Sequence, residues 1–388
     1  MRGIKNNRKI IYSAGFLFSL SAALMAYINS SFLASFVGEK TVGIIYSLGS
    51  VFLILAFSLI PLFFKKMGGY RFLLLAIGLD ILSILVLVLS KDIWALATAF
   101  ILGFALYTII IFSLDEFLKI FSKDSITGKI RGTYLTVINS AWILSQVMLI
   151  FGQAKNLLSF RQVYSIALLV MVLFFLLSLF ALRKVADPKY DNIRTVKFIG
   201  KFFSNRNLAR AFSMVFLLQF FYCWMIIYTP IYLSAHLGFN WQQIGIIFAV
   251  MLLPFVLLDI PLGKLSDKVG ERKMLIFGFL LTSIATFILF FLPGGSVLIW
   301  ALALLGTRIG AATVEAMCDI YFFKHIEPEN EEFVGVYRGA SPLAYIIGPL
   351  LASAIFIFIP SFNFIFPILG LVTISGVYLS AGIKKSDI

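Results

Sequence analysis

The sequence has few residues of the kinds that build metal centres, disulfide frameworks and most active sites. It holds two Cys and two His in 388 residues, too few for a disulfide framework or a His-rich metal site. It contains no GxxxxGK[ST] phosphate-binding loop, no HExxH and no GxSxG nucleophile motif. Neither an ATP-driven pump nor a common hydrolase is therefore indicated. We expect no enzyme activity, no cofactor and no resident metal.

Charged residues are also scarce, at 13% of the chain, whereas hydrophobic residues make up 61% and the mean hydropathy is +1.01. A soluble protein has roughly 25% charged and 45–50% apolar residues. A soluble fold of this size could not bury so much apolar surface, and a disordered chain needs low hydrophobicity. These values indicate a membrane protein.

Twelve apolar runs are each long enough to cross a bilayer as a helix of about 20 residues. A polar, basic segment follows the sixth run. We therefore predict an all-α membrane protein with an N-terminal six-helix bundle in 1–184, a cytoplasmic linker in 185–208 and a C-terminal six-helix bundle in 209–388. The predicted helices span 10–36, 41–64, 71–90, 93–118, 131–154, 161–183, 209–235, 241–263, 273–292, 296–323, 334–359 and 361–383.

The net charge of +14 would suit a nucleic-acid-binding protein, but the positions of the basic residues favour another explanation. Of the 32 Lys and Arg, 27 fall in the termini and alternate loops on one side of the predicted membrane. The opposite loops carry only Lys40, Lys91, Lys155 and Arg161, and Arg308 lies inside a predicted helix. By the positive-inside rule, both termini of this cell-membrane protein are cytoplasmic. We expect the basic residues to contact lipid headgroups and no nucleic acid.

The two halves share short motifs in the same order and at a nearly constant spacing of 200 to 207 residues. Such a pattern is typical of a parallel repeat of six helices. The matching segments are GIIY at 43–46 with GIIF at 245–248, IPL at 60–62 with IPL at 260–262, Gly69 and Arg71 with Gly270 and Arg272, and GKIRG at 128–132 with GVYRG at 335–339.

The loop at 263–273 reads GKLSDKVGERK and resembles the loop signature of the major facilitator superfamily, G-x-L-x-D-x-x-G-x-R-K. The twelve-helix layout with a basic central loop is similar to that family over essentially the full length. The resemblance implies a secondary active transporter that moves a small solute by alternating access, as a symporter or an antiporter. We expect a monomer. The corresponding loop of the first half, PLFFKKMGGYR at 61–71, has no residue that matches the Asp of this signature.

The resemblance also implies that the loop at 263–273 belongs to a cytoplasmic gate. Asp267 would accept hydrogen bonds at the start of a neighbouring helix, and Arg272 would pair with Asp319. A basic turn that only sets the topology is the alternative. The predicted gate residues are Gly263, Asp267, Gly270, Arg272, Lys273, Asp319, Asp115, Arg71, Arg131 and Arg338.

Charged residues inside the predicted helices are the main candidates for a substrate or ion site, since a charge at the bilayer centre costs about 2.5–3.5 kcal/mol. Arg308 and Glu315 are spaced i and i+7 and share one face of the tenth predicted helix. One hypothesis is that Arg308 contacts an anionic solute and Glu315 is a protonatable partner. The other is that Arg308 forms a buried pair with Glu315 or Asp80 that only fastens helices.

Polar and aromatic residues also fall at mid-helix positions that the family resemblance places around a central cavity. The aromatic residues there would suit an amphipathic solute.

Glu315, Asp80 and Asp319 carry carboxyl groups that can take up and release a proton, so H+ is the expected coupling ion. Alternative functions are a non-transporting receptor or partner subunit of the same fold, a channel, and drug/proton efflux. The substrate-binding or coupling candidates are Arg308, Glu315, Asp80, Tyr27, Asn29, Asn139, Trp142, Gln146, Gln219, Tyr222, Tyr228 and Tyr345.

Overall fold

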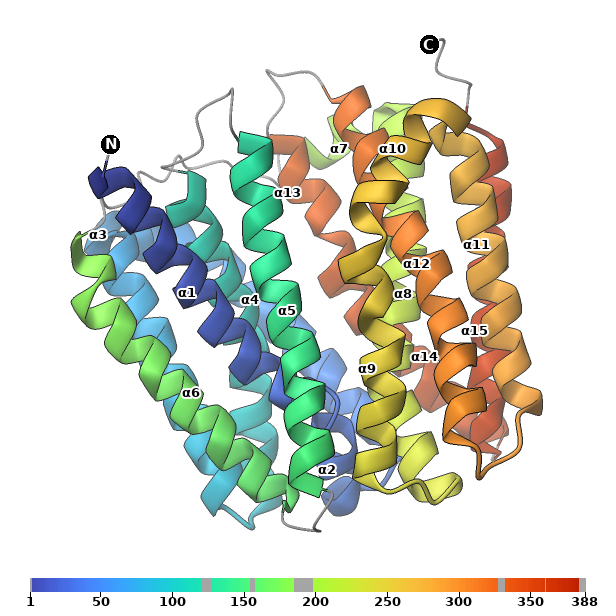
Figure 1. The fold of residues 1–388 in the computed structure, drawn as a ribbon, viewed down its shortest axis with the longest axis horizontal. Helices are drawn as coiled ribbons and strands as arrows, with labels where there is room; N and C mark the ends of the chain where they lie inside the picture. The colour runs from blue at the N-terminus through green and yellow to red at the C-terminus, as the bar shows by residue number, and fades with distance from the viewer. Residues whose placement is uncertain are drawn as a thin grey trace. The chain divides into compact units, whose positions relative to one another are not determined.

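The structure of the chain, a computed structural model, describes residues 2–119, 127–153, 158–184, 198–326, 332–359 and 361–383. All regular secondary structure in these ranges is helical (Figure 1). Ten helices of the described chain are long and apolar enough to cross a membrane, and two shorter apolar helices cover Val42–Phe57 and Trp241–Leu257. These findings confirm an all-α, multi-pass membrane protein with twelve apolar helical segments.

The chain divides into two compact units, Met1–Asn192 and Ile193–Ile388, and the division falls within the segment predicted as a linker. The helices of the N-terminal unit are α1 (Arg2–Ala26), α2 (Asn29–Val37), α3 (Val42–Leu89), α4 (Ile93–Lys119), α5 (Thr127–Gln153) and α6 (Phe160–Phe180). Those of the C-terminal unit are α7 (Ile199–Ser204), α8 (Arg206–Ile231), α9 (Trp241–Leu257), α10 (Asp259–Val269), α11 (Glu271–Ile288), α12 (Val297–His325), α13 (Glu332–Arg338), α14 (Ala340–Phe358) and α15 (Ile365–Ala381).

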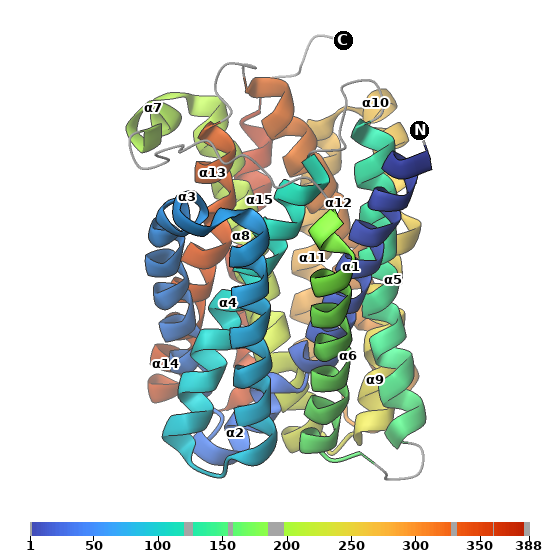
Figure 2. The same ribbon diagram turned by 90° about the vertical axis from the view of Figure 1, so that its left-hand side faces the viewer.

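The same packing pattern occurs inside each unit. In the N-terminal unit α1 packs on α5 and α6, and α3 packs on α4 and α6. Figures 1 and 2 both show α1 running between α5 and α6. In the C-terminal unit α8 packs on α14 and α15, and α11 packs on α12 and α15. The first spanning helix of each unit therefore contacts the fifth and sixth. In the N-terminal unit α3, which contains both the second and the third spanning segments, contacts α4 and α6 as α11 contacts α12 and α15, which agrees with a parallel repeat.

Glycines in a left-handed backbone conformation mark corresponding turns of the two units. Gly38 (φ 80°) corresponds to Gly238 (φ 70°), and Gly68 (φ 78°) corresponds to Gly270 (φ 84°). Gly68 interrupts α3 with ψ 160°, and Gly270 ends α10 with ψ 146°. Only glycine adopts such angles without strain. The backbone therefore aligns Gly68 with Gly270, which shifts the sequence-based match of Gly69 by one residue.

The first spanning helix of each unit departs from regular α-helical geometry. Tyr27 and Ile28 form a turn between α1 and α2. In the C-terminal unit α8 contains Pro230 near its end and continues into a π-helical turn over Tyr232–His236. Because proline removes a helix hydrogen bond, an irregular turn near Pro230 has a direct physical cause. The break at Tyr27 has no proline and was not predicted.

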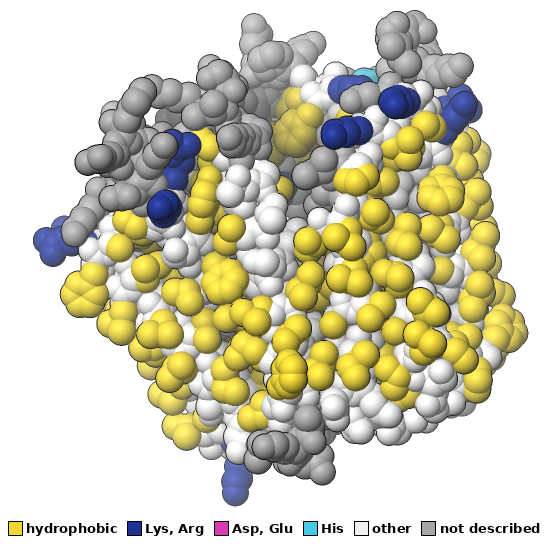
Figure 3. Space-filling view, in the orientation of Figure 1, with side chains coloured by type: hydrophobic (Ala, Val, Ile, Leu, Met, Phe, Trp, Pro, Cys, Tyr) yellow, Lys and Arg dark blue, Asp and Glu magenta, His cyan; other side chains and the backbone are white. Residues whose placement is uncertain are grey.

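Each unit has a core of large apolar side chains and an apolar outer surface. Phe18, Phe117 and Phe174 lie in the core of the N-terminal unit, and Phe221, Trp224 and Trp300 are fully buried in the C-terminal unit. Hydrophobic side chains also cover the flanks of the helices in Figure 3. An apolar outer surface on a helical bundle is the expected result of a lipid environment.

Candidate functional site

The candidate site lies on α12, whose Arg308 is a buried cation in the middle of a membrane-spanning helix. Its side chain is 2% exposed. The helix ends at His325, about 26 Å from Arg308 at 1.5 Å per residue. Glycines lie two residues before and two residues after it, and at Gly310 the backbone of α11 comes close enough to leave no room for a Cβ atom. Small residues thus let a neighbouring helix pack tightly beside the arginine.

Two consecutive aromatic residues of α8 surround the guanidinium group. Its Cζ atom lies 5.4 Å from the centre of the Phe221 ring and 5.1 Å from the centre of the Tyr222 ring. Both distances are within the range of a cation–π interaction. The Arg308 Nε–H is buried and has no hydrogen-bond acceptor among the described residues. Within the described chain, no ion pair joins Arg308 to a carboxylate, so the alternative in which Arg308 pairs with Glu315 is not observed.

Glu315 is instead held by a residue of another helix. The Tyr222 hydroxyl donates a hydrogen bond of 2.8 Å to Glu315 Oε2. The same Tyr222 ring faces the guanidinium of Arg308. Tyr222 therefore connects the cation and the carboxylate, which are spaced too far apart along α12 to touch directly. Phe221, Tyr222, Arg308 and Glu315 are called the α8–α12 cluster below.

A second pair of a tyrosine and a carboxylate lies one helical turn further along α12. The Tyr337 hydroxyl of α13 donates a hydrogen bond of 3.0 Å to Asp319 Oδ1. Tyr337 is also near enough to Glu315 to interact with it electrostatically. Asp319 is exposed and Glu315 is half-buried. Two carboxylates and two hydroxyls thus form a polar row from the exposed part of α12 to the cluster around Arg308.

The loop at 263–273 contacts α12 through residues that were not predicted. Glu271 forms an ion pair with Lys324, and Asp319, the partner predicted for Arg272, accepts a hydrogen bond from the Tyr337 hydroxyl. The side chains of Asp267 and Arg131 lie outside the described residues. Gly263 lies within α10 and Gly270 makes the turn. The exposed predicted gate residues are Arg71, Arg272, Lys273 and Arg338, and Asp115 is half-buried.

The predicted polar residues of the N-terminal unit form separate small contacts. The Tyr27 and Trp142 rings meet edge to face with centres 6.1 Å apart. Asn29 Oδ1 accepts a hydrogen bond of 2.7 Å from the Tyr164 hydroxyl. Gln146 is buried, with its Nε2 3.1 Å from Ser145 Oγ and its Oε1 without a described partner. Asn139 is half-buried on the same helix, α5.

Asp80 is a buried carboxylic acid on α3, away from these contacts. It is 4% exposed, and its carboxyl group lies against Gly103 of α4. No hydrogen bond or ion pair between Asp80 and another described side chain is present in the N-terminal unit.

The remaining predicted residues of the C-terminal unit differ in burial. Tyr228 is fully buried and packs against Trp224, Phe356 and Phe362. Gln219 and Tyr345 are half-buried. Phe221 and Tyr337 belong to the site but were not predicted. A phenylalanine among 42 in the chain carries no sequence signal, whereas Tyr337 lies in the repeated motif at 335–339 and was detectable there.

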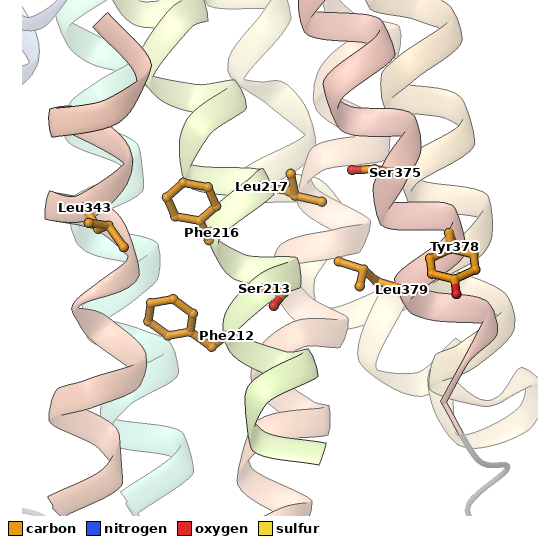
Figure 4. Close-up of a pocket in the computed structure, with 8 residues that line it drawn as sticks. All are labelled: Phe212, Ser213, Phe216, Leu217, Leu343, Ser375, Tyr378 and Leu379. Atoms are coloured by element: carbon orange, nitrogen blue, oxygen red, sulfur yellow. The ribbon is translucent and has the colours of Figure 1, made fainter. Parts of the chain in front are cut away.

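An apolar groove on the C-terminal unit is distinct from the α8–α12 cluster. It has a volume of about 430 Å³ and opens between α8, α14 and α15 (Figure 4). Its lining includes two serines but no charged residue, and Tyr378 at its edge is 83% exposed. A groove of this kind offers a few hydroxyl groups but no charged group to bind an ionic solute. We therefore place the candidate site at the α8–α12 cluster.

Comparisons with known proteins agree with this architecture. Residues 223–384 match the family model of the Major Facilitator Superfamily. No curated protein matches the sequence. Among solved structures, a POT family transporter in complex with 5-aminolevulinic acid has a TM-score of 0.77 at 13% identity, covering 97% of this chain and 95% of that one. The POT family transporter PepTSo has a TM-score of 0.75 at 11% identity, covering 97% of both chains.

The nucleoside transporter NupG has the same fold, with a TM-score of 0.77 at 10% identity over 96% of this chain and 98% of that one. Identities this low show the fold and carry no substrate from one protein to another. The whole chain thus has the fold of major facilitator transporters, and its C-terminal unit carries the sequence match to that superfamily. The resemblance first recognised in the loop at 263–273 is confirmed.

Proposed function

We propose that this chain, a protein of the major facilitator fold, is a secondary transporter that moves a small solute across the cell membrane by alternating access. Its similarity in fold to three solved transporters supports transport in preference to catalysis. The observation that carries the proposal is Arg308, a buried cation inside a spanning helix without a carboxylate partner in the described chain. Charged residues in such positions mark substrate or ion pathways.

The α8–α12 cluster is the proposed substrate site. Arg308 would bind the solute, and Tyr222 would hold Glu315 beside it through the observed hydrogen bond. Gln219 of α8 and Tyr345 of α14 are further candidates in the same unit. The candidates in the N-terminal unit are Tyr27, Asn29, Asn139, Trp142 and Gln146.

Coupling to H+ is part of the proposal. Glu315 and Asp319 each accept a hydrogen bond from a tyrosine. The polar row that these four side chains form leads from the exposed carboxylate of Asp319 to the α8–α12 cluster. Protonation of Glu315 would remove its negative charge next to Arg308 and so change the affinity for a charged solute. Asp80 is the second candidate for a coupling carboxylate.

The loop at 263–273 is the proposed cytoplasmic gate element. Its contact with the end of α12 through Glu271 and Lys324 joins the loop to the helix that carries Arg308. A displacement of α12 during transport would strain or break this ion pair, which gives the gate a direct link to the substrate site.

A flux experiment tests the proposal. The purified full-length protein is reconstituted as a monomer in liposomes, and uptake of a panel of labelled solutes is measured with and without a pH gradient. A secondary transporter gives saturable uptake of at least one solute, and a protonophore abolishes its accumulation. Non-saturating flux would indicate a channel, and binding without any flux would indicate a receptor. Proton-driven export from inside-out vesicles would identify the efflux mode.

The orientation also has a direct test. The native cysteines, Cys223 and Cys318, are buried, whereas Lys40 and Lys264 are exposed at opposite predicted sides. In intact cells a membrane-impermeant maleimide should label Lys40→Cys and should label Lys264→Cys only after permeabilisation, because positive loops stay cytoplasmic. The reverse labelling pattern would contradict cytoplasmic termini.

A further inference from the structure

Arg308 has aromatic neighbours but lacks a counter-ion in the described structure. We propose that the solute itself supplies this counter-ion, so that the site takes a solute with one negative charge, such as a monocarboxylate. The inference rests on the proposed function and names the chemical class of its substrate. It is carried by the burial of Arg308, its two ring contacts and its missing acceptor, taken together.

The surroundings of Arg308 satisfy only part of what a guanidinium group requires. The Phe221 and Tyr222 rings attract a cation through their electron-rich faces. Neither ring supplies an oxygen acceptor, and the Nε–H lacks one among the described residues. A guanidinium has five N–H donors arranged to bind the two oxygens of a carboxylate. A solute carboxylate would therefore complete both the charge and the hydrogen bonding.

Glu315 sets the limit of one negative charge. Tyr222 holds its carboxylate through a 2.8 Å hydrogen bond while the same ring contacts Arg308. A solute bound at Arg308 thus lies near a protein carboxylate, and like charges at close range repel each other in a low-dielectric site. Arg308 offsets the first negative charge of the solute but has no further positive charge for a second one, so a dianion would be disfavoured, whereas a neutral or hydrogen-bonding tail would be accepted.

Thermal unfolding of the purified full-length protein tests the proposal with simple carboxylates in place of the physiological solute. The probes are sodium acetate, lactate and benzoate, each compared with its neutral amide at equal ionic strength, and sodium succinate as a dianion. The variants are Arg308→Gln and Arg308→Lys. Arg210→Gln, which removes a half-buried arginine from α8 outside the cluster, is the matched control.

We expect at least one monocarboxylate to raise the midpoint temperature of the wild-type protein in a saturable manner, while its amide and succinate do not. Arg308→Gln should weaken this binding by at least about 30-fold, as expected for removing one partner of a buried, hydrogen-bonded charge pair. Arg308→Lys should retain part of the response, and Arg210→Gln should retain all of it.

The solute-free variants give a second and independent result. If the counter-ion arrives with the solute, Arg308→Gln removes a buried charge that the two aromatic rings offset only in part, and the midpoint temperature should stay unchanged or rise by up to about 4 °C. A lowered midpoint temperature would show that Arg308 has a structural partner and would overturn the proposal. Equal stabilisation by a carboxylate and its amide, or no stabilisation by any of the three monocarboxylates, would also overturn it.

Failure of the inference can be distinguished from failure of the proposed function. Saturable flux of a neutral or cationic solute that survives Arg308→Gln would leave the transporter in place and exclude the anion site. Monocarboxylate binding that depends on Arg308, without flux in liposomes, would keep the anion site and exclude transport.

Discussion

Glu315→Gln should abolish proton-driven accumulation of the solute while leaving solute exchange intact, and it should strengthen the binding of an anionic solute because a nearby negative charge is removed. A pH difference of one unit supplies about 1.4 kcal/mol per transported proton, enough for roughly tenfold accumulation. A glutamine in place of Glu315 keeps a hydrogen-bond acceptor for the Tyr222 hydroxyl but cannot take up a proton. Accumulation in liposomes with an imposed pH gradient should therefore fall to the level without a gradient.

Two further variants serve as a comparison and a control for Glu315→Gln. Tyr222→Phe removes the hydroxyl that holds Glu315 but leaves the carboxylate, so coupling should persist with a shifted pH profile. Glu39→Gln removes a carboxylate from the loop between α2 and α3 and should have no effect. Wild-type accumulation by Glu315→Gln would exclude Glu315 as the coupling group, and Asp80→Asn would then test the other buried carboxylate.

Gly310→Ala should severely destabilise the C-terminal unit. A Cβ atom at this position would lie 2.6 Å from the backbone nitrogen of Thr282 and 2.7 Å from the carbonyl oxygen of Gly278, and it would also overlap Thr282 Oγ1. Backbone atoms cannot move aside as a flexible side chain can, so α11 and α12 would have to separate. Overpacking in a core costs about 1–3 kcal/mol and occasionally more, and we expect the upper end of this range.

Gly306→Ala is the matched control, one helical turn away on α12. A Cβ atom there would lie 3.6 Å from the Cβ atom of Ala285, which is an ordinary contact. Alanine also favours a helix over glycine by about 1 kcal/mol. Thermal unfolding of the two purified variants should show a large loss of stability for Gly310→Ala and none for Gly306→Ala. Equal midpoint temperatures would contradict the close backbone contact.

The spanning helices could be predicted from the sequence because each needs a long apolar run, and hydrophobicity alone identifies such runs. The irregularities within them could not. Tyr27 and Ile28 interrupt the first helix without a proline or glycine at the break. Tertiary packing in the bundle can outweigh the preference of these residues for a helix. The sequence matched Gly69 to Gly270, whereas the backbone matches Gly68 to Gly270. Residues 68 and 69 are both glycines, and only their backbone angles distinguish them.

The sequence identified Arg308 as a candidate residue but not the side chains that contact it. Every other basic residue falls in a terminus, in a loop between predicted helices or near the end of one. Counting the basic residues of each loop was therefore sufficient to identify Arg308. The sequence left open whether Arg308 contacts a solute or pairs with Glu315 or Asp80. No ion pair between Arg308 and a carboxylate is present in the described chain, and Glu315, seven residues away on the same helix, is separated from it by about 10.5 Å along the axis. Helix periodicity shows which residues share a face but gives no information about neighbours on another helix. Tyr222 and Phe221 approach from α8, and only the fold places them there.

The two units have the same backbone conformation at corresponding turns, which lie at Gly38 and Gly238 and at Gly68 and Gly270. Their side chains have not stayed equivalent. α4 carries no charged residue before Asp115, whereas its counterpart α12 carries Arg308 in its middle. The buried arginine inside a spanning helix belongs to the C-terminal unit, whereas the buried carboxyl group of Asp80 belongs to the N-terminal unit. If Arg308 binds the solute as proposed, charge recognition belongs to the C-terminal unit, and exchanging residues of α4 for those of α12 would not produce a second site of the same kind.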